Sequence, residues 1–218
     1  MPTDGPEVHL RVAIPDDATW LAEVDATTGG VRSPALGFER DPLIAELEAG
    51  DWASDDKWAW AVLVDGRPAG FALVTGMTSG DGQMQIRLKP SERGQGVGRE
   101  VLRQLADHHF AAHDHLQRLV GETHEHNIPM QRAFNAAGFR MEARYRDSMA
   151  GDDGALAARW GYALTRQDWT VGRHRIDDDG YDLHGLTFLV DEVLDGPKTG
   201  SSGLTFEFFQ DGRRSSPG

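Results

Sequence analysis

The 218-residue sequence predicts a mixed α/β fold with a mostly antiparallel sheet flanked by helices. Segments that alternate apolar and polar residues, typical of strands, are interspersed with segments whose apolar residues recur at helical spacing. Three strand-like segments follow one another at short intervals between residues 57 and 88, which favours antiparallel pairing. A glycine-rich loop then joins the last of them to a helical segment.

The first half of the chain supplies two helices and four strands. The segment His9–Ile14 alternates apolar and polar residues and predicts a strand, after which Pro15 opens a helix. A second helix begins at Asp41-Pro42 and stops at Gly50. The three strand-like segments that follow are Lys57–Val64, Ala69–Thr75 and Gln83–Leu88.

The second half adds a helix over Arg99–His113, a short strand over Arg118–Glu122 and a helix over Asn127–Ala137. Gly138 follows that helix as a C-terminal glycine stop. Two further strand-like segments surround a turn at residues 151–154; they are Phe139–Met149 and Ala155–Thr165.

We expect one domain over residues 1–169 and a C-terminal extension over residues 170–218. The extension holds two apolar runs, within His184–Leu194 and Gly203–Gln210, that could pair as a β-hairpin, and its last residues predict a loose tail. Such runs need a surface to cover them, either the sheet or a second subunit, so a homodimer is one expected arrangement.

Composition excludes several classes of protein. The chain has 22 Lys+Arg against 35 Asp+Glu, a formal charge of −13, and no run of five basic residues, so we expect no nucleic-acid partner. It has no apolar stretch of membrane-spanning length and no N-terminal secretory pattern. Cys is absent, which excludes thiol catalysis and Cys-ligated metals and is compatible with the reducing cytoplasm, the compartment we expect.

The most informative stretch is the loop Arg93–Gly98, with sequence RGQGVG. Its three glycines let the backbone turn tightly and bring N–H groups close to a ligand. The helix that follows directs its unpaired N–H groups and the positive end of its dipole to the same place. The loop therefore predicts a phosphate or pyrophosphate site, although a simple strand-to-helix turn would have the same composition.

Three known phosphate loops compete for this stretch. A P-loop needs Gly-Lys-Ser/Thr, which is missing, and a Rossmann loop needs Gly-x-Gly-x-x-Gly, a spacing that this loop does not have. The pattern Arg/Gln-x-x-Gly-x-Gly/Ala is met by Arg93, Gly96 and Gly98. This pattern resembles the acyl-CoA pyrophosphate loop of the GNAT N-acetyltransferases.

The surrounding sequence strengthens the resemblance. The stretch Ile86–Leu102 is similar to the family's fourth strand, pyrophosphate loop and third helix. Asn127-Ile128-Pro129-Met130 and Phe134–Phe139 resemble the second signature, in which Asn opens a helix that closes on Gly-Phe. Residues 160–169, WGYALTRQDW, are similar to the ending of the ribosomal-protein-alanine N-acetyltransferase branch. The resemblance covers residues 8–169 and implies the GNAT fold, with six to seven strands.

The resemblance implies acetyl-CoA as cofactor. In the family a bulge in the fourth strand leaves backbone N–H groups free, and the pantetheine arm lies beside them. Asn127 could contact the cofactor, serve as a helix N-cap, or do both. The expected cofactor contacts are Ile86, Arg87, Leu88, Arg93, Gly94, Gln95, Gly96, Val97, Gly98, Arg99, Asn127, Met130 and Phe134.

GNAT enzymes transfer acetyl directly to a primary amine, which must first lose a proton. Glu122, at the end of the fifth strand, is the first candidate base and His124 the second, followed by His126; each could instead be a solvated loop residue. Many family members carry a Tyr at the position of Phe134 to protonate the leaving thiolate, so that acid is missing here. A His cluster around His109 and His113 lacks a recognised metal frame, and we expect no metal.

The sequence thus predicts acetyl-CoA-dependent N-acetylation of an amine-bearing small molecule or peptide. Protein N-termini, polyamines, amino-acid derivatives and aminoglycoside-like amines all remain open as acceptors. The alternative is a non-catalytic acyl-CoA-binding or sensing module, which the missing Tyr permits. A plain interaction protein is a third hypothesis, which a thermal shift with acetyl-CoA would exclude.

Overall fold

The computed structural model describes residues 5–28, 36–150, 155–173, 209–210 and 213–214. The chain divides into two compact units, Met1–Ile176 and Asp177–Gly218, and each is considered by itself. In the second unit the described residues form a two-residue ladder, in which β8 (Phe209–Gln210) pairs with β9 (Arg213–Arg214). The predicted strand at His184–Leu194 lies outside the described residues, so the hairpin stays a prediction.

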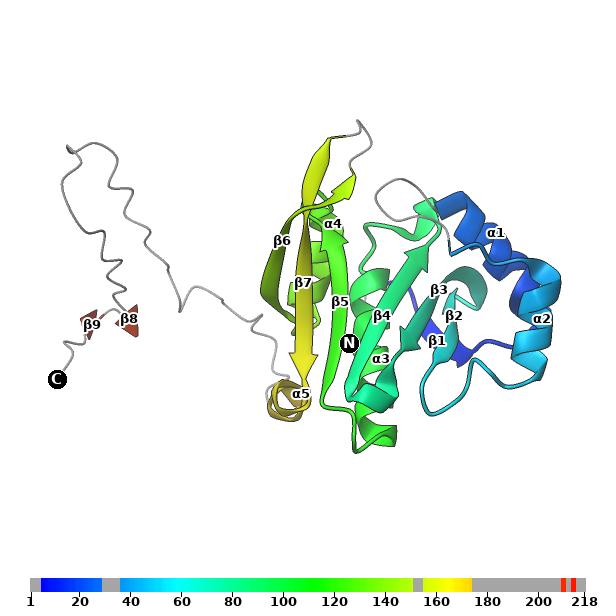
Figure 1. The fold of residues 1–218 in the computed structure, drawn as a ribbon, viewed down its shortest axis with the longest axis horizontal. Helices are drawn as coiled ribbons and strands as arrows, with labels where there is room; N and C mark the ends of the chain where they lie inside the picture. Colours follow the sequence, from blue (N-terminus) through cyan, green and yellow to red (C-terminus); the bar gives the residue numbers. More distant parts are fainter. Residues whose placement is uncertain (1–4, 29–35, 151–154, 174–208, 211–212, 215–218) are drawn as a thin grey trace. The chain divides into compact units, whose positions relative to one another are not determined.

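Within the described residues of the first unit, seven strands form one sheet in the order β1-β2-β3-β4-β5-β7-β6 (Figure 1). All neighbouring pairs are antiparallel except β4 and β5, which run parallel. This architecture confirms the predicted fold class. The strands are β1 (Val8–Val12), β2 (Trp58–Val64), β3 (Arg67–Thr75), β4 (Asp81–Leu88), β5 (Arg118–His124), β6 (Arg140–Ala150) and β7 (Leu156–Thr165).

The helices lie on both faces of the sheet (Figure 1). They are α1 (Ala18–Thr28), α2 (Arg40–Glu48), α3 (Val97–Ala112), α4 (Ile128–Ala136) and α5 (Arg166–Arg173), with 3-10 turns η1 (Pro15–Asp17), η2 (Met77–Ser79) and η3 (Pro90–Glu92). The first two pack on β2 and β3, whereas α3 packs on the opposite face, as the two core clusters show.

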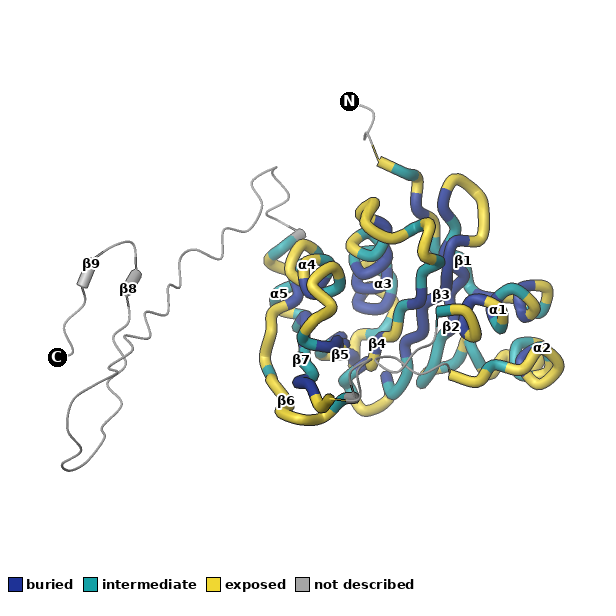
Figure 2. The backbone as a smooth tube through the Cα atoms, turned by 90° about the horizontal axis from the view of Figure 1, so that it is seen from above, coloured by how far each residue is buried: buried dark blue, intermediate teal, exposed yellow. Residues whose placement is uncertain are grey.

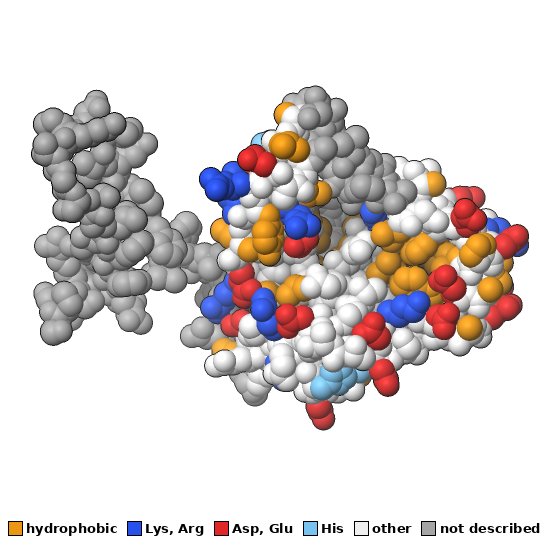
Figure 3. Space-filling model, in the orientation of Figure 1, with side chains coloured by type: hydrophobic (Ala, Val, Ile, Leu, Met, Phe, Trp, Pro, Cys, Tyr) orange, Lys and Arg blue, Asp and Glu red, His pale blue; other side chains and the backbone are white. Residues whose placement is uncertain are grey.

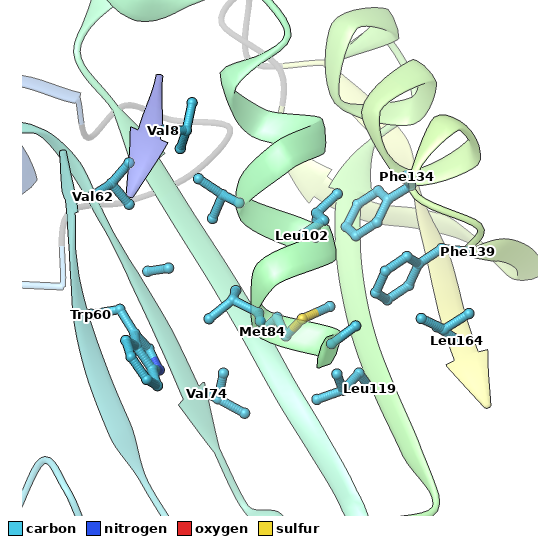
Figure 4. Packing of buried hydrophobic residues seen from close by; sticks show 14 of the residues in the cluster. Val8, Trp60, Val62, Val74, Met84, Leu102, Leu119, Phe134, Phe139 and Leu164 are labelled. Carbon is cyan, nitrogen blue, oxygen red and sulfur yellow. The ribbon is translucent and has the colours of Figure 1, made fainter. Parts of the chain in front are cut away.

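Strand alternation divides the apolar residues between two cores. In β2, Trp60 and Val62 belong to the core under α3, and Ala59 belongs to the core under α1 and α2. The larger core contains Leu102 of α3 and Phe134 of α4, which project toward the strands (Figure 4). Figure 2 shows the central strands and α3 buried along much of their length, with exposed backbone in the loops around them.

Several strand boundaries differ from the predictions: β3 begins at Arg67, inside the predicted turn, and β5 continues past Glu122 to His124. The first strand covers Val8–Val12 and ends two residues before Ile14, because Pro15 already begins η1. The strand expected from Gln83 begins at Asp81, inside the predicted glycine-rich break. Gly82 pairs with Leu119 of β5, and a Cβ there would lie 2.9 Å from the Leu119 side chain, so glycine serves close packing at this position.

Helix α5 was not predicted. Thr165 Oγ1 accepts a hydrogen bond from the Asp168 backbone N–H at 3.0 Å, and Asp168 Oδ2 accepts from the Thr165 hydroxyl at 2.7 Å. This is the Thr-x-x-Asp signature of a helix start, so the sequence did contain the signal. Arg166 donates to the carbonyls of Phe110, His113 and Leu116, and Trp169 Nε1 donates to Asp107 Oδ1. The helix is thereby bound to the C-terminal end of α3.

The predicted boundary after residue 169 can be tested by truncation. A chain that ends at Ile176 keeps α5, whereas a chain that ends at Thr165 also loses the Arg166 and Trp169 contacts. We expect the chain that ends at Ile176 to lose solubility or melting temperature if the extension covers apolar surface. The shorter chain should lose about 3 kcal/mol or more in addition, because Arg166 bonds three carbonyls. An unchanged melt and elution volume for the chain ending at Ile176 would remove the covering role of the extension.

The His residues near the end of α3 pack against two Trp rings of β2. Trp60 Nε1 donates to His109 Nε2 at 3.1 Å, and the rings of Trp60 and His108 lie 4.5 Å apart. His109 stacks on His113 at 5.6 Å. His109 is fully buried, and this burial, together with the neighbouring His108 and His113, lowers the pKa of His109 to about 3. The imidazole is therefore neutral in the folded protein throughout the neutral range.

This burial makes stability depend on pH. In the unfolded chain His109 takes up a proton below about pH 6.5, which the folded protein does not, so stability falls as pH drops from about 6.5 toward about 3 and is constant above. Between pH 7 and 5 His109 alone should remove about 2 kcal/mol. Urea unfolding at the two pH values measures this. His109→Gln keeps an acceptor for Trp60 without titrating, so its pH dependence should be shallower; equal slopes would contradict the account.

Candidate active site

The sheet opens between its two parallel strands. Pairing between β4 and β5 runs from Asp81 and Arg118 to Met84 and Gly121 and stops there. Beyond this point β4 continues to Leu88 along β3, and β5 continues along β7. Figure 1 shows the two strands diverging, and in the same orientation Figure 3 shows the surface hollowed there.

The backbone of β4 presents hydrogen-bonding groups to this opening. Lys89 N–H donates to the Ala69 carbonyl at 2.9 Å, which fixes the alternation of the antiparallel ladder. The peptide groups of Arg87 therefore face β3, and those of Ile86 and Leu88 face the opening. No register shift interrupts the pairing of β4 with β3 or β5, so the strands part by divergence and not at the expected bulge.

Helix α4 presses against β5 where the pairing stops. A Cβ on Gly121 would lie 2.6 Å from Phe134 Cζ, so only glycine leaves room for this ring. The Phe134 ring is buried and stacks on Tyr162 of β7 at 4.8 Å, with an interplanar angle of 9°. Burial raises the pKa of Tyr162. The predicted contact residue Phe134 thus belongs to the packing that borders the opening, and it carries no acid.

The loop before α3 has the shape that its glycines predicted. Gly94 has φ 77° and Gly96 has φ 83°, in the region that favours glycine. Gly96 is the N-cap of α3, and among the described residues no side chain caps this helix. The first-turn amides of Val97, Gly98 and Arg99 therefore point outward with the positive end of the helix dipole.

Two side chains hold the loop in place. Arg93 Nε donates to the Leu88 carbonyl at 3.0 Å, and Gln95 Nε2 donates to the Ser91 carbonyl at 2.6 Å. Arg93 and Arg99 are exposed, so their guanidinium groups can meet an anion at the helix start. Gly98 is already helical, and a Cβ there would make ordinary contact with Ala133 of α4 at 3.8 Å.

Asn127 is the N-cap of α4. Its Oδ1 accepts a hydrogen bond from the Met130 backbone N–H at 3.3 Å, so one of the two roles considered for it is occupied. Its amide nitrogen has no partner in the described part of the chain, which leaves a cofactor contact open. Met130 is partly buried against the larger core.

Glu122 is the first residue of β5 beyond the last pair with β4, and it lies on the face opposite α3 and α4. Its Oε2 forms an ion pair with Arg159 Nη1 of β7 at 2.9 Å, and each side chain is 37% exposed. His124 lies two residues farther on the same face and is buried. Sequence reasoning missed Arg159, since only the register of β5 and β7 shows that it faces Glu122.

His124 accepts a hydrogen bond at Nδ1 from the His126 backbone N–H, at 3.1 Å. A neutral imidazole that accepts at Nδ1 carries its proton on Nε2. In this state Nε2 is a donor and cannot take a proton from an amine. Of the two predicted bases, Glu122 is thus the one whose side chain can accept a proton from the amine.

A buried arginine lies on β4. Arg87 is 7% exposed, and burial lowers the pKa of its guanidinium, with a smaller opposing effect from Asp25 and a smaller lowering effect from Arg93. Asp25 of α1 is buried and accepts backbone N–H groups from three residues before α2: Leu36 at 2.9 Å, Gly37 at 2.8 Å and Phe38 at 3.3 Å. The Arg87 side chain thus belongs to the α1 face of the sheet.

Two further features of the described residues concern metal ions and membranes. No group of three or more His, Asp or Glu side chains there is arranged to hold a metal ion. None of the described helices has the length and apolar character needed to cross a membrane.

Comparison with known proteins agrees with this geometry. The family model of the acetyltransferase (GNAT) domain matches residues 8–140. The chain belongs to the GNAT acetyltransferase family. GNAT membership implies transfer of an acetyl group from acetyl-CoA to an amine and leaves the acceptor open. No curated protein sequence matches this GNAT chain.

Several solved structures share the GNAT fold. RimJ from Mycobacterium smegmatis in complex with CoA-disulfide is 19% identical with a TM-score of 0.60, over 77% of this chain and 90% of that one. Spermidine N-acetyltransferase from Vibrio cholerae in complex with CoA and spermine is 14% identical with a TM-score of 0.62, over 75% and 98%. Ribosomal-protein-S5-alanine acetyltransferase from Vibrio fischeri is 15% identical with a TM-score of 0.60, over 74% and 94%. At these identities the likeness of the neighbours shows the shared fold.

The loop geometry of this GNAT domain gives a graded prediction for CoA binding. Gly96→Val forces a β-branched residue to φ 83° and moves the first-turn amides, so affinity for CoA should fall at least tenfold, about 1.4 kcal/mol. Gly98→Ala adds a Cβ in ordinary contact distance and should change affinity less than threefold. Calorimetric titration with CoA measures both. Equal affinities for wild type and Gly96→Val would contradict the loop assignment.

Proposed function

We propose that this protein transfers an acetyl group from acetyl-CoA to the primary amine of an acceptor, by direct attack within a ternary complex. The observation that carries the proposal is the place where β4 and β5 part. The glycine-rich loop with the uncapped start of α3 lies on one face, and Glu122 lies on the other, at the first position beyond the last strand pair.

In this proposal the cofactor passes through the sheet. The pyrophosphate lies on the amides of residues 95–99, with Arg93 and Arg99 beside it. The pantetheine arm extends along the peptide groups of Ile86 and Leu88, which face the opening. Hydrogen bonds to the arm take the place of those that a paired strand would make. The thioester then reaches the face that carries Glu122.

The chemistry needs a donor for the oxyanion and a base for the amine. The Ile86 N–H, facing the opening, is placed to stabilise the negative charge that develops on the thioester carbonyl oxygen. Glu122 takes the amine proton directly or through a water molecule, while Arg159 orients its carboxylate. The nitrogen attacks the carbonyl carbon, the carbon–sulfur bond breaks, and the second proton that the nitrogen then carries is lost to solvent or to the departing thiolate. A thiolate of pKa about 8.5 leaves without a phenol at the position of Phe134.

The alternative is a module that binds acyl-CoA without turnover. One observation favours it, since Phe134 supplies no proton where many family members have a Tyr. A thiol-release assay against a panel of amines separates the two functions: cofactor binding without turnover on any amine would favour the sensing module.

Glu122→Gln tests the base. The amide keeps a hydrogen-bond acceptor for Arg159 but cannot take up a proton, so kcat should fall at least tenfold, about 1.4 kcal/mol in the barrier, with unchanged affinity for acetyl-CoA. The matched control is Glu142→Gln. It removes an exposed carboxylate of β6 that forms an ion pair with Arg118 of β5. Unchanged kcat in Glu122→Gln, or an equal loss in both variants, would remove Glu122 from this role.

A further inference from the structure

Two polar side chains flank the place where the sheet opens. Met84 and Gly121 form the last pair of β4 and β5, so Gln85 and Glu122 are the first residues beyond it on their strands. Successive side chains of a strand alternate between faces, and no register shift interrupts this parallel pair. Gln85 therefore leaves the same face of the sheet as Glu122, the proposed base.

Gln85 is exposed although β4 lies in the middle of the seven-stranded sheet. Its neighbour on β3, Leu73, is 3% exposed and belongs to the core under α1 and α2. At this level of the sheet the packed core therefore ends at β3. The surface is hollowed where β4 and β5 part (Figure 3), and in the described part of the chain the Gln85 amide has no hydrogen-bond partner.

Glu122 is held from the side opposite to Gln85. In the sheet β5 lies between β4 and β7, and Arg159 of β7 binds Glu122 Oε2 at 2.9 Å. Among the described residues Glu122 Oε1 has no partner, so the carboxylate keeps one oxygen for a ligand. A ligand between β4 and β5 would thus meet the Glu122 carboxylate from one side and the Gln85 amide from the other.

The spacing of the two strands suits a single nitrogen atom. Side chains of adjacent paired strands leave the sheet about 4.8 Å apart, and at the first residue beyond the last pair the strands have only begun to diverge. Two oxygen atoms that each accept a hydrogen bond of about 2.9 Å from one tetrahedral nitrogen lie about 4.7 Å apart. One amine nitrogen can therefore donate to Gln85 and to Glu122 at once.

We propose that Gln85 binds the acceptor nitrogen. Once Glu122 has taken up the amine proton, Gln85 Oε1 accepts one of the two remaining hydrogens and the Glu122 carboxyl group, which keeps acceptor capacity, accepts the other. The lone pair then points to the opening, where the thioester carbonyl carbon would lie, which orients the nitrogen for attack. No bond forms or breaks at Gln85. This inference rests on the proposed function and adds a residue to its acceptor site.

The test measures the preference for a primary amine over its N-methyl derivative, which when neutral has one hydrogen and cannot fill both acceptors. With saturating acetyl-CoA, kcat/KM from thiol release is measured for alaninamide, benzylamine and an alanine-initiated tripeptide amide, each beside its N-methyl derivative. Gln85→Leu removes the acceptor at similar size. The preference should fall about three- to tenfold, the effect of one neutral hydrogen bond, with unchanged KM for acetyl-CoA. Comparing the ratio between proteins cancels the intrinsic reactivity of the amines.

Two further variants separate this role from a structural one. Gln83→Leu alters another exposed glutamine of the same face, but Gln83 pairs with Val120 before the strands part, so the preference should keep its wild-type value. Gln85→Glu keeps an acceptor oxygen and loses the N–H donor, so it should retain the preference for primary amines. An equal loss in Gln85→Glu and Gln85→Leu would contradict the proposal, because the amide would then act as a donor.

The outcomes distinguish the two proposals. If acetyl-CoA binds and none of the primary amines reacts, the proposed function fails. If the amines react and Gln85→Leu loses no more of the preference than Gln83→Leu, only the role of Gln85 is overturned. A wild-type protein that acetylates the N-methyl derivatives as fast as the primary amines would overturn that role as well, and this result does not depend on whether any variant folds.

Discussion

The end of pairing between β4 and β5 at Met84 and Gly121 is the constraint on which the rest of the site depends. Each strand keeps its partner on the other side, so the sheet loses no stability from the separation beyond one row of hydrogen bonds. The peptide groups of Ile86 and Leu88 are left facing an opening. Phe134, packed on Gly121, supports β5 at the same level and keeps the divergence fixed.

The opening connects two faces of opposite chemistry. The start of α3 offers outward amides and exposed arginines, which suit the anionic end of a cofactor. The opposite face carries Glu122 with its ion-pair partner Arg159. A long ligand that spans the sheet can therefore be held by charge at one end and present an uncharged thioester to a carboxylate at the other. The proposed cofactor would therefore meet a locally basic surface although the net charge of the chain is −13.

Much of this could be predicted from the sequence, because periodicity and glycine placement are local properties. The sheet, the α3 loop and the Asn127 cap follow from residues close in the chain. The register of β5 against β7 is not local, so the pairing of Glu122 with Arg159, and the direction of His124, could not be derived. Helix α5 was missed although Thr165 and Asp168 carried its signal.

The most direct test of the opening is residue-resolved amide hydrogen exchange on β4, with and without saturating acetyl-CoA. Without cofactor, the Arg87 amide, bonded to β3, should exchange slowly, whereas the Ile86 amide should exchange quickly. On binding, Ile86 should become protected at least tenfold and Arg87 should change little. An Ile86 amide that is already protected without cofactor, or that does not respond to saturating acetyl-CoA, would contradict the account.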